Sequence, residues 1–418
     1  MLRSLGTRNY RIFVAGHAVS VIGTWMQRVA QDWLVLEVTD SAVAVGIASA
    51  LQFLPMLLFG LWGGVLVDRM DRRTLIIWTQ VASALLAAVL AAVVLAGTVE
   101  LWMIYTLALA LGFVTVLDSP ARQAFVAELV GPDDYVNGQA LASTVHNTGR
   151  LIGPALAGVL IAATGPGVAF AVNAVSFLAV LWGLALLDVD ALRRIPPAPR
   201  MPGQVREGLR YVWGHPDLRA CMILVAVIAL FGQNFRVVLP VFARETFHGG
   251  AEVYGWLTSA LGLGAVLGAL ATASRERVSA WALLLAAFGF GALNLVAAVS
   301  PLLWIALGAM VTVGVANIVF NTLARTLLQL GTDRAMHGRV MAFHGFVFLG
   351  STPIGAPLLG WVCEVWGARA GFVVAGGTAL IASLALLRRL RHLRGDAAPR
   401  SDLRASRVVP VAGAPRAH

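Results

Sequence analysis

The chain contains 418 residues, of which 59% are hydrophobic and 12% are charged, and its formal net charge is +10. Soluble globular domains are about 45 to 50% apolar and about 25% charged, so this composition excludes an ordinary soluble, secreted, fibrous or disordered chain. A charge of this sign suggests nucleic-acid binding in a soluble domain, whereas in a membrane protein it first indicates topology.

Twelve apolar stretches are each long enough to cross about 30 Å of hydrocarbon as an α-helix. We therefore predict an all-α polytopic membrane protein with twelve transmembrane helices. The first stretch lacks the short apolar core and small-residue cleavage site of a signal peptide, so we expect it to be retained. The predicted spans are 12–36, 42–67, 74–97, 101–121, 138–164, 167–188, 219–243, 253–273, 278–299, 302–325, 339–363 and 368–388.

The first span carries two ionisable residues, Arg28 and Asp32, one helical turn apart on the same face. Ionisable groups inside a membrane span are costly and are functional candidates by default. Our hypothesis is that Asp32 binds a coupling proton, and that Arg28 pairs with the charged form and is released by the protonated one. The alternative is a static ion pair without a coupling role.

The loop between the second and third spans reads GGVLVDRMDRR and contains the pattern G-x-x-x-D-R-x-x-R-R. With twelve spans and a long central connection, this motif resembles the signature loop of the major facilitator superfamily, whose members transport by alternating access. The resemblance implies a gating role, and the alternative is a loop that only fixes topology. The family usually has a second glycine where this chain has Asp71, and its usual arginine inside the fourth span has no counterpart here. The predicted gating residues are Gly64, Asp68, Arg69, Arg72, Arg73 and Arg122.

The fifth span reads GRLIGPALAG and resembles the G-x-x-x-G-P-x-x-G-G element of family members that export drugs in exchange for protons. The alternative is a generic small-residue packing face. Two further stretches, GTWMQRVAQDWLVLEVTDSAVAVG and LDSPARQAFVAELV, are similar to the branch that contains the enterobactin exporter and related secretion permeases. These resemblances favour export. The residues of the fifth-span element are Gly149, Gly153, Pro154, Ala157 and Gly158.

The arginines predict the orientation of the chain in the membrane. All 31 basic residues are arginines, and with the N-terminus inside, the outer loops keep only Arg244 and Arg369. The positive-inside rule therefore places both termini in the cytoplasm and the protein in the cell membrane. The positive charge then serves topology, and we expect no nucleic-acid partner.

The longest connection, residues 189–218, divides the spans six and six. It contains the Pro-rich run IPPAPRMPG and an amphipathic stretch, QVREGLRYVWGH, that is suited to the membrane surface. We predict a six-helix bundle over 1–188, this cytoplasmic linker, a second six-helix bundle over 219–390, and a disordered cytoplasmic tail over 391–418.

The two halves share an internal repeat. A shift of 202 positions aligns Ile152, Gly153, Leu156, Gly158, Gly165 and Phe170 with Ile354, Gly355, Leu358, Gly360, Gly367 and Phe372. A shift of one more residue aligns Asp118 and Arg122 of the fourth span with Asn321 and Arg325 of the tenth. Parallel repeats around an axis normal to the membrane, with a substrate site between them near the midplane, are a transporter architecture.

Polar side chains inside the apolar spans are expected to line a water-filled cavity, because contact with lipid is unfavourable for them. Arg150 and Arg236 are candidates to bind an anionic group, and Trp25 is a candidate contact for an aromatic or amphipathic substrate. The alternatives are hydrogen bonds between helices and ordinary aromatic packing. The predicted cavity residues are Gln27, Gln31, His146, Asn147, Arg150, Gln233, Asn234, Arg236, Asn317, Asn321, Arg325 and His344.

No P-loop, metal-ligand cluster or interpretable catalytic group is found, so we predict that the protein is not an enzyme and uses no cofactor or metal. The predicted function is a proton-coupled exporter, an antiporter, of small amphipathic molecules such as drugs or siderophore-like metabolites. It is expected to work as a monomer among membrane lipids. The alternatives are a proton-coupled importer of a small nutrient, and a transport-inactive membrane sensor or scaffold of the same fold.

Overall fold

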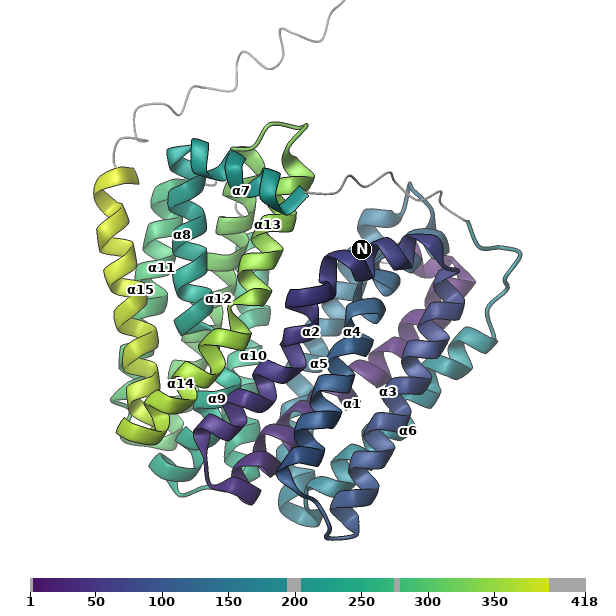
Figure 1. Ribbon diagram of the computed structural model, residues 1–418, viewed down its shortest axis with the longest axis horizontal. Helices are drawn as coiled ribbons and strands as arrows, with labels where there is room; N and C mark the ends of the chain where they lie inside the picture. Colours follow the sequence, from purple (N-terminus) through teal and green to yellow (C-terminus); the bar gives the residue numbers. More distant parts are fainter. Residues whose placement is uncertain (1–2, 194–203, 274–278, 391–418) are drawn as a thin grey trace, which may run out of the picture.

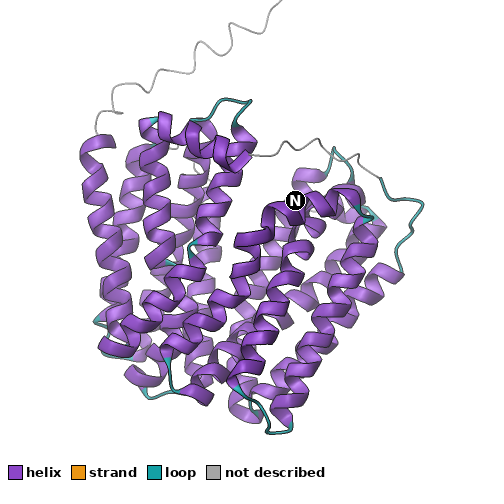
Figure 2. Cartoon of the chain, in the orientation of Figure 1, coloured by secondary structure: helices purple, strands orange, loops and turns teal. Residues whose placement is uncertain are grey.

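The computed structural model describes residues 3–193, 204–273 and 279–390, and every regular element in these ranges is helical (Figure 1 and Figure 2). The Pro-rich run and the predicted disordered tail lie outside the described residues. The amphipathic stretch of the linker forms the short helix α7. The helices are η1 (Arg3–Gly6), α1 (Arg8–Thr39), α2 (Ala42–Arg69), α3 (Arg72–Leu95), α4 (Leu101–Val130), α5 (Tyr135–Thr164), α6 (Pro166–Ala185), α7 (Gln204–Gly214), α8 (Pro216–Gly232), α9 (Phe235–Val241), η2 (Phe242–Thr246), α10 (Ala251–Ala273), α11 (Ala280–Ala298), α12 (Leu303–Leu330), α13 (His337–Gly350), α14 (Thr352–Trp366) and α15 (Ala368–Leu390).

In the part of the chain that the structure describes, ten segments are long and apolar enough to cross a membrane. Two of these segments join consecutive helices, α8 to η2 and α13 to α14. Helices α1 and α5 are not among the ten. Both carry polar side chains in their middle turns, Arg28 and Asp32 in α1 and His146 and Arg150 in α5, and these lower the mean hydropathy.

Three predicted spans have a different shape from the one expected. The seventh is interrupted at Gln233 and Asn234, between α8 and α9, and the eleventh changes helix at Ser351. The fourth continues as α4 to Val130, well beyond its predicted end near residue 121. This extension matters for the site, because it moves Asp118 from the edge of a span to the interior of a long helix.

Helix ends follow local sequence signals. The Asp71 side chain accepts a hydrogen bond from Thr74 N at 2.8 Å and caps α3, while Ser41 caps α2 through Ala44 N. Gly165 and Gly367, which the internal repeat aligns, have φ values of 80° and 82° and follow the last residues of α5 and α14. Only glycine adopts this conformation without strain, so the repeat preserves a backbone feature as well as sequence.

The two halves of the chain contact each other mainly through a few helices. In Figure 1, α3 and α6 of the first half lie on the right, and α8, α11 and α15 of the second half lie on the left. The halves meet where α2 packs on α14 and where α5 packs on α10. Helix α1 begins and α15 ends at the same end of the molecule, which we call the terminal side. The end where α1 stops at Thr39 is called the opposite side.

Small residues bring the halves close together toward the opposite side. A Cβ atom added to Gly360 of α14 would lie 2.5 Å from the Ala42 carbonyl oxygen of α2. One added to Gly255 of α10 would lie 2.5 Å from the Pro154 carbonyl oxygen of α5. The backbones therefore touch there without room for a side chain.

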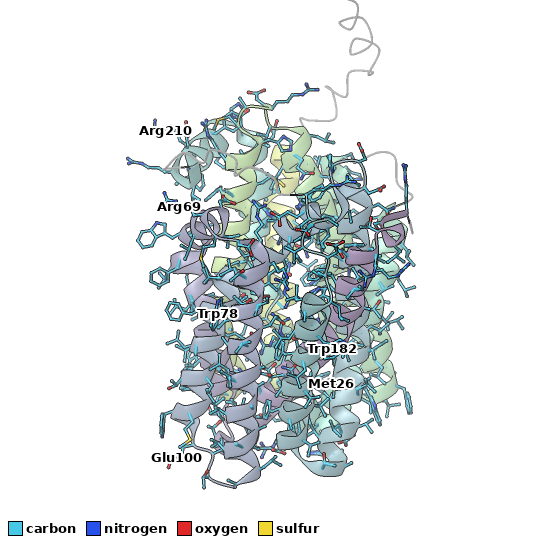
Figure 3. All side chains as sticks on the ribbon, turned by 90° about the vertical axis from the view of Figure 1, so that its right-hand side faces the viewer. Met26, Arg69, Trp78, Glu100, Trp182 and Arg210 are labelled. Carbon is cyan, nitrogen blue, oxygen red and sulfur yellow. The ribbon has the colours of Figure 1, made fainter. Side chains whose placement is uncertain are left out.

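Large apolar side chains cover the outer surface of the helices. Trp62, Trp78, Trp182 and Trp304 are each between 65% and 79% exposed, as expected for residues that face lipid. Figure 3 shows Arg69 and Arg210 toward the terminal side and Glu100 at the opposite side.

Candidate functional site

A polar cavity of about 750 Å³ lies among α1 to α6 and reaches α12. On α1 its lining runs from Phe13 to Arg28, and it extends to Tyr135 at the start of α5, so it occupies the terminal-side part of the molecule. Among the described residues, its lining has three arginines, two histidines and one carboxylate. These are Arg28, Arg122, Arg325, His17, His146 and Asp118.

Three residues of the predicted cavity set line this cavity, namely Gln27, His146 and Arg325. Arg28 of the predicted proton-coupling pair and Arg122 of the gating set line it as well. Several others bond between or within C-terminal helices instead: Gln233 donates to Asn321 at 3.1 Å, and Asn321 donates to Asn317 at 2.7 Å. The predicted residues outside the lining are Gln31, Asn147, Arg150, Gln233, Asn234, Arg236, Asn317, Asn321 and His344.

Asp32 is completely buried next to the deep end of the cavity, and its carboxylate joins helices from both halves. Arg236 of α9 forms a bidentate pair with it, with Nη2 2.7 Å from Oδ1 and Nε 2.8 Å from Oδ2. Tyr254 of α10 donates its hydroxyl to Oδ2 at 2.9 Å. Arg236 Nη1 also donates to Gln52 Oε1 at 2.8 Å, and Gln52 lines the cavity. We call Asp32, Arg236, Tyr254 and Gln52 the Asp32 cluster.

The partner of Asp32 differs from the sequence-based expectation, which assigned Arg28. The Arg28 guanidinium carbon instead lies 4.5 Å from the ring centroid of Trp25, in a cation–π contact. A bidentate pair requires the guanidinium to approach in the plane of the carboxylate. Arg236 satisfies this geometry from another helix, whereas Arg28 lies over Trp25 on its own helix.

Trp25 is surrounded by three basic side chains, which with it we call the Trp25 cluster. The Arg150 guanidinium carbon lies 5.9 Å from the Trp25 ring centroid, and the His146 ring packs edge-on at 5.7 Å. Trp25, Arg28 and His146 all line the cavity. Arg28 of α1 thus brings positive charge to the wall of the cavity, and Arg150 of α5 lies beside the same indole but outside the lining.

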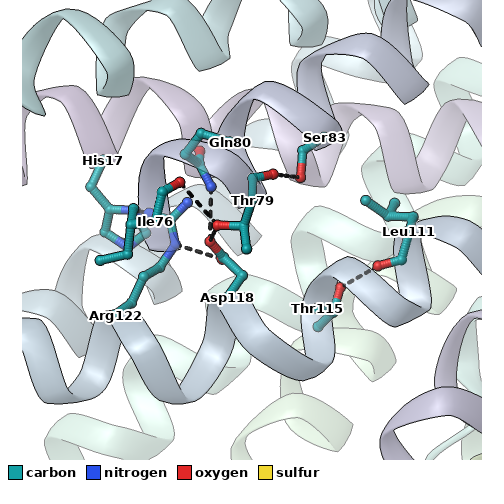
Figure 4. Close-up of polar contacts among 9 residues, drawn as sticks. All are labelled: His17, Ile76, Thr79, Gln80, Ser83, Leu111, Thr115, Asp118 and Arg122. Atoms are coloured by element: carbon teal, nitrogen blue, oxygen red, sulfur yellow. Dashed lines mark hydrogen bonds and ion pairs between the residues drawn. The ribbon is translucent and has the colours of Figure 1, made fainter. Parts of the chain in front are cut away.

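A second polar group, the Asp118 cluster, lies nearer the terminal side (Figure 4). Asp118 accepts hydrogen bonds from Arg122 Nε at 2.6 Å, Thr79 Oγ1 at 2.7 Å and Gln80 Nε2 at 2.9 Å. Arg122 Nη1 is also 2.8 Å from His17 Nδ1. Side chains of α1, α3 and α4 therefore satisfy one another along the cavity wall.

Asp118 is absent from the site residues predicted from the sequence. The predicted end of the fourth span, at residue 121, placed it near the edge of the membrane, whereas α4 continues to Val130. Two signals were present: the i, i+4 spacing of Asp118 and Arg122, and their alignment with Asn321 and Arg325 in the repeat.

The loop motif holds N-terminal helices together at the terminal side. Arg72 forms a buried ion pair with Glu128 of α4, and Arg73 donates through Nε and Nη2 to the Leu184 carbonyl oxygen of α6, at 3.1 and 2.8 Å. Gly64 is buried, Asp68 is half-buried and Arg69 is exposed. Asp71, where the family usually has glycine, is explained by its role as the cap of α3.

The fifth-span element packs on two helices at once. Cβ atoms added to Gly149 or Gly153 would meet Val21 or Trp25 of α1, and one added to Gly158 would lie 2.9 Å from the Ala251 carbonyl oxygen of α10. Pro154 and Ala157 are buried between these contacts. The element thus lets α5 lie close to both halves of the molecule.

A model of the family described as transmembrane secretion effector matches residues 2–411. The chain is 26% identical to the staphyloferrin A transporter of Staphylococcus aureus over 62% of its own length and 66% of that protein. It is 27% identical to the multidrug efflux pump Tap of Mycolicibacterium fortuitum, over 89% of this chain and 93% of that one. It is also 27% identical to the enterobactin exporter EntS of Shigella boydii, over 92% of each chain.

The fold is shared with solved transporter structures. A bacterial homolog of the human lysosomal transporter Spinster, in an inward-facing and occupied conformation, superposes with a TM-score of 0.73 at 13% identity, covering 93% of this chain and 98% of that one. A nucleoside transporter, NupG, gives a TM-score of 0.72 at 11% identity, covering 91% and 99%. At these identities the likeness concerns the fold alone.

Proposed function

We propose that this chain, which belongs to the transmembrane secretion effector family of major facilitator superfamily transporters, exports small amphipathic molecules in exchange for protons. It is a multi-pass membrane transporter of small molecules and not an enzyme. Relatives named as a multidrug efflux pump and as an enterobactin exporter support export, and a cavity lined by arginines, amides and aromatic side chains supports an amphipathic cargo.

The observation that carries the proton coupling is the ion pair between buried Asp32 and Arg236. It connects α1 to α9, and Tyr254 adds α10, at a place where the two halves meet. Opening the opposite side must move these helices apart. A charged carboxylate left without its partner in apolar surroundings is strongly unfavourable, so Asp32 takes up a proton as the pair separates.

The direction of proton movement follows from this step. Asp32 takes its proton while the opposite side is open and releases it when the pair with Arg236 forms again and the cavity opens to the terminal side. Cargo moves from the terminal side to the opposite side in the same cycle. With the terminal side in the cytoplasm, protons enter the cell as cargo leaves it, which is antiport by alternating access.

The membrane arrangement is part of this proposal. Counting α8 to η2 and α13 to α14 as one span each, and adding α1 and α5, there are twelve spans, in six-helix bundles over 1–188 and 219–390 around the linker 189–218. The arginine distribution supports cytoplasmic termini in the cell membrane, with Arg69 and Arg210 on the cytoplasmic side. The protein then acts as a monomer surrounded by lipid.

The test uses the purified protein in phosphatidylcholine liposomes with three fluorescent probes of equal size: 2-naphthoate, 2-naphthamide and 2-naphthylmethylamine. A proton gradient is expected to drive at least one probe against its concentration gradient, with protons moving the other way. Asp32→Asn is expected to abolish this uphill movement while downhill movement persists, because the amide cannot bind the proton. Glu100→Gln, an exposed carboxylate far from the cluster, is the matched control.

Two outcomes contradict the proposal. Co-directional movement of protons and probe indicates symport and import. Full gradient-driven movement in Asp32→Asn removes the coupling role of this residue.

A further inference from the structure

Arg28 and Arg150 carry positive charge that no described carboxylate neutralises through an ion pair. Asp32, one turn from Arg28, is occupied by Arg236 and Tyr254. Asp118, the carboxylate of the cavity lining, already accepts from Arg122, Thr79 and Gln80.

Such an excess of cations inside a membrane protein is unfavourable by itself. Two guanidinium groups on one indole repel each other, and the cation–π contact offsets this only in part. Arg325 adds a further positive charge to the lining of the same cavity. Unpaired charges inside a membrane protein therefore indicate a binding role for an oppositely charged group.

We propose that the Trp25 cluster is the binding site for the charged group of an organic anion, and that the exported cargo is an anion with a planar apolar portion. This inference rests on the proposed export function. Arg28 contacts the anionic group directly from the cavity wall, and Arg150 adds the second positive charge beside Trp25. The apolar portion lies against the aromatic and aliphatic part of the lining, where Phe13, Val21 and Phe177 are found.

An organic anion is favoured over an inorganic one by the composition of the wall. A small inorganic anion would be matched by the arginines but gains nothing from the indole or from the apolar side chains. A carboxylate attached to a planar ring uses both parts at once, and Arg is the side chain best suited to hold a carboxylate beside an aromatic face.

Equilibrium binding tests this proposal without requiring transport. The purified full-length protein, in nanodiscs of zwitterionic phosphatidylcholine, is titrated calorimetrically with 2-naphthoate, 2-naphthamide, 2-naphthylmethylamine and inorganic phosphate. The dissociation constant of the carboxylate is expected to be at least about tenfold lower than that of the amide. The amine and phosphate are expected to bind more weakly still.

Variants assign the binding to the named residues. Arg28→Gln is expected to raise the dissociation constant of 2-naphthoate about tenfold, and Arg150→Gln by a smaller factor, while binding of 2-naphthamide stays the same. Arg28→Lys keeps the charge and is expected to retain the preference for the anion. Arg210→Gln removes the same charge from an exposed position on α7 and serves as the matched control. Unchanged elution on size exclusion and unchanged amide binding show that each variant is folded.

The outcomes separate this inference from the proposed function. Equal affinity for the three naphthalene compounds overturns it, as does phosphate binding as tight as that of the carboxylate, or an equal effect of Arg28→Gln and Arg210→Gln. Selective anion binding with no proton-driven movement of any probe keeps the site and rejects the antiport mechanism. Proton-driven movement without selective anion binding keeps the antiport mechanism and rejects the anion site.

Discussion

Asp32 of α1 and Arg236 of α9 form a bidentate ion pair between residues 204 positions apart in the chain. The carboxylate is completely buried, while the arginine side chain is 21% exposed. The pair lies next to Gln52, which also lines the polar cavity, so a change in the cavity can reach the contact between the halves through a single side chain.

The Asp32–Arg236 pair is expected to contribute to the free energy of unfolding as a coupled pair. Asp32→Ala or Arg236→Ala should each lower the free energy of unfolding by about 2 to 4 kcal/mol, because each leaves its partner buried without a counter-charge. The double variant should lose much less than the sum, since neither charge then remains. Chemical denaturation of the four proteins in detergent measures the coupling, and strictly additive losses would show that the two residues are energetically independent.

Asp118 is expected to moderate the positive charge of the cavity. Asp118→Asn retains an acceptor for Thr79 but removes the negative charge beside Arg122. The dissociation constant of 2-naphthoate should therefore fall about threefold to tenfold, the reverse of the Arg28→Gln effect. Calorimetric titration in nanodiscs measures this dissociation constant. Asp133→Asn, at an exposed position between α4 and α5, is the control and should leave binding unchanged.

Close contact between α5 and α10 leaves no space for a methyl group. Gly255→Ala places a Cβ atom 2.5 Å from the Pro154 carbonyl oxygen and 2.9 Å from Gly158 Cα, so it should lower the free energy of unfolding by about 1 to 3 kcal/mol. Gly289→Ala on α11 has no heavy atom within 4 Å of the added Cβ and should be neutral or slightly stabilising. Thermal melting of both variants decides the point, and equal midpoints would argue that the halves are loosely packed there.

The departure of the loop motif at Asp71 has a simple energetic test. Asp71→Ala removes the side-chain cap of α3 and should cost about 1 kcal/mol. Asp71→Asn keeps an acceptor for Thr74 N and should retain most of the stability. Asp71→Gly restores the glycine usual in the family and should cost only a few tenths of a kcal/mol. Thermal unfolding ranks the three, and a larger loss for glycine than for alanine would contradict the capping role.

Several site residues were identifiable from the sequence because their signal is local. An ionisable residue in an apolar stretch is conspicuous wherever it packs, so Asp32, Arg28, Arg150 and Arg236 were all selected. Asp118 was missed because hydropathy locates the end of a span poorly, and α4 extends to Val130. The breaks at Gln233 and Ser351 were missed for the same reason, since a short interruption barely changes the average over a long apolar window.

By itself, the sequence determined the helical membrane architecture, the repeated glycines at Gly165 and Gly367, the loop motif and the candidate charges, because hydropathy, backbone preference and charge are properties of single residues or short windows. The tertiary structure alone decided the partners: Asp32 with Arg236 and not Arg28, and Arg28 with Trp25. Pairing between helices depends on how each helix is rotated and how closely its neighbours approach, and these follow from packing across the whole molecule.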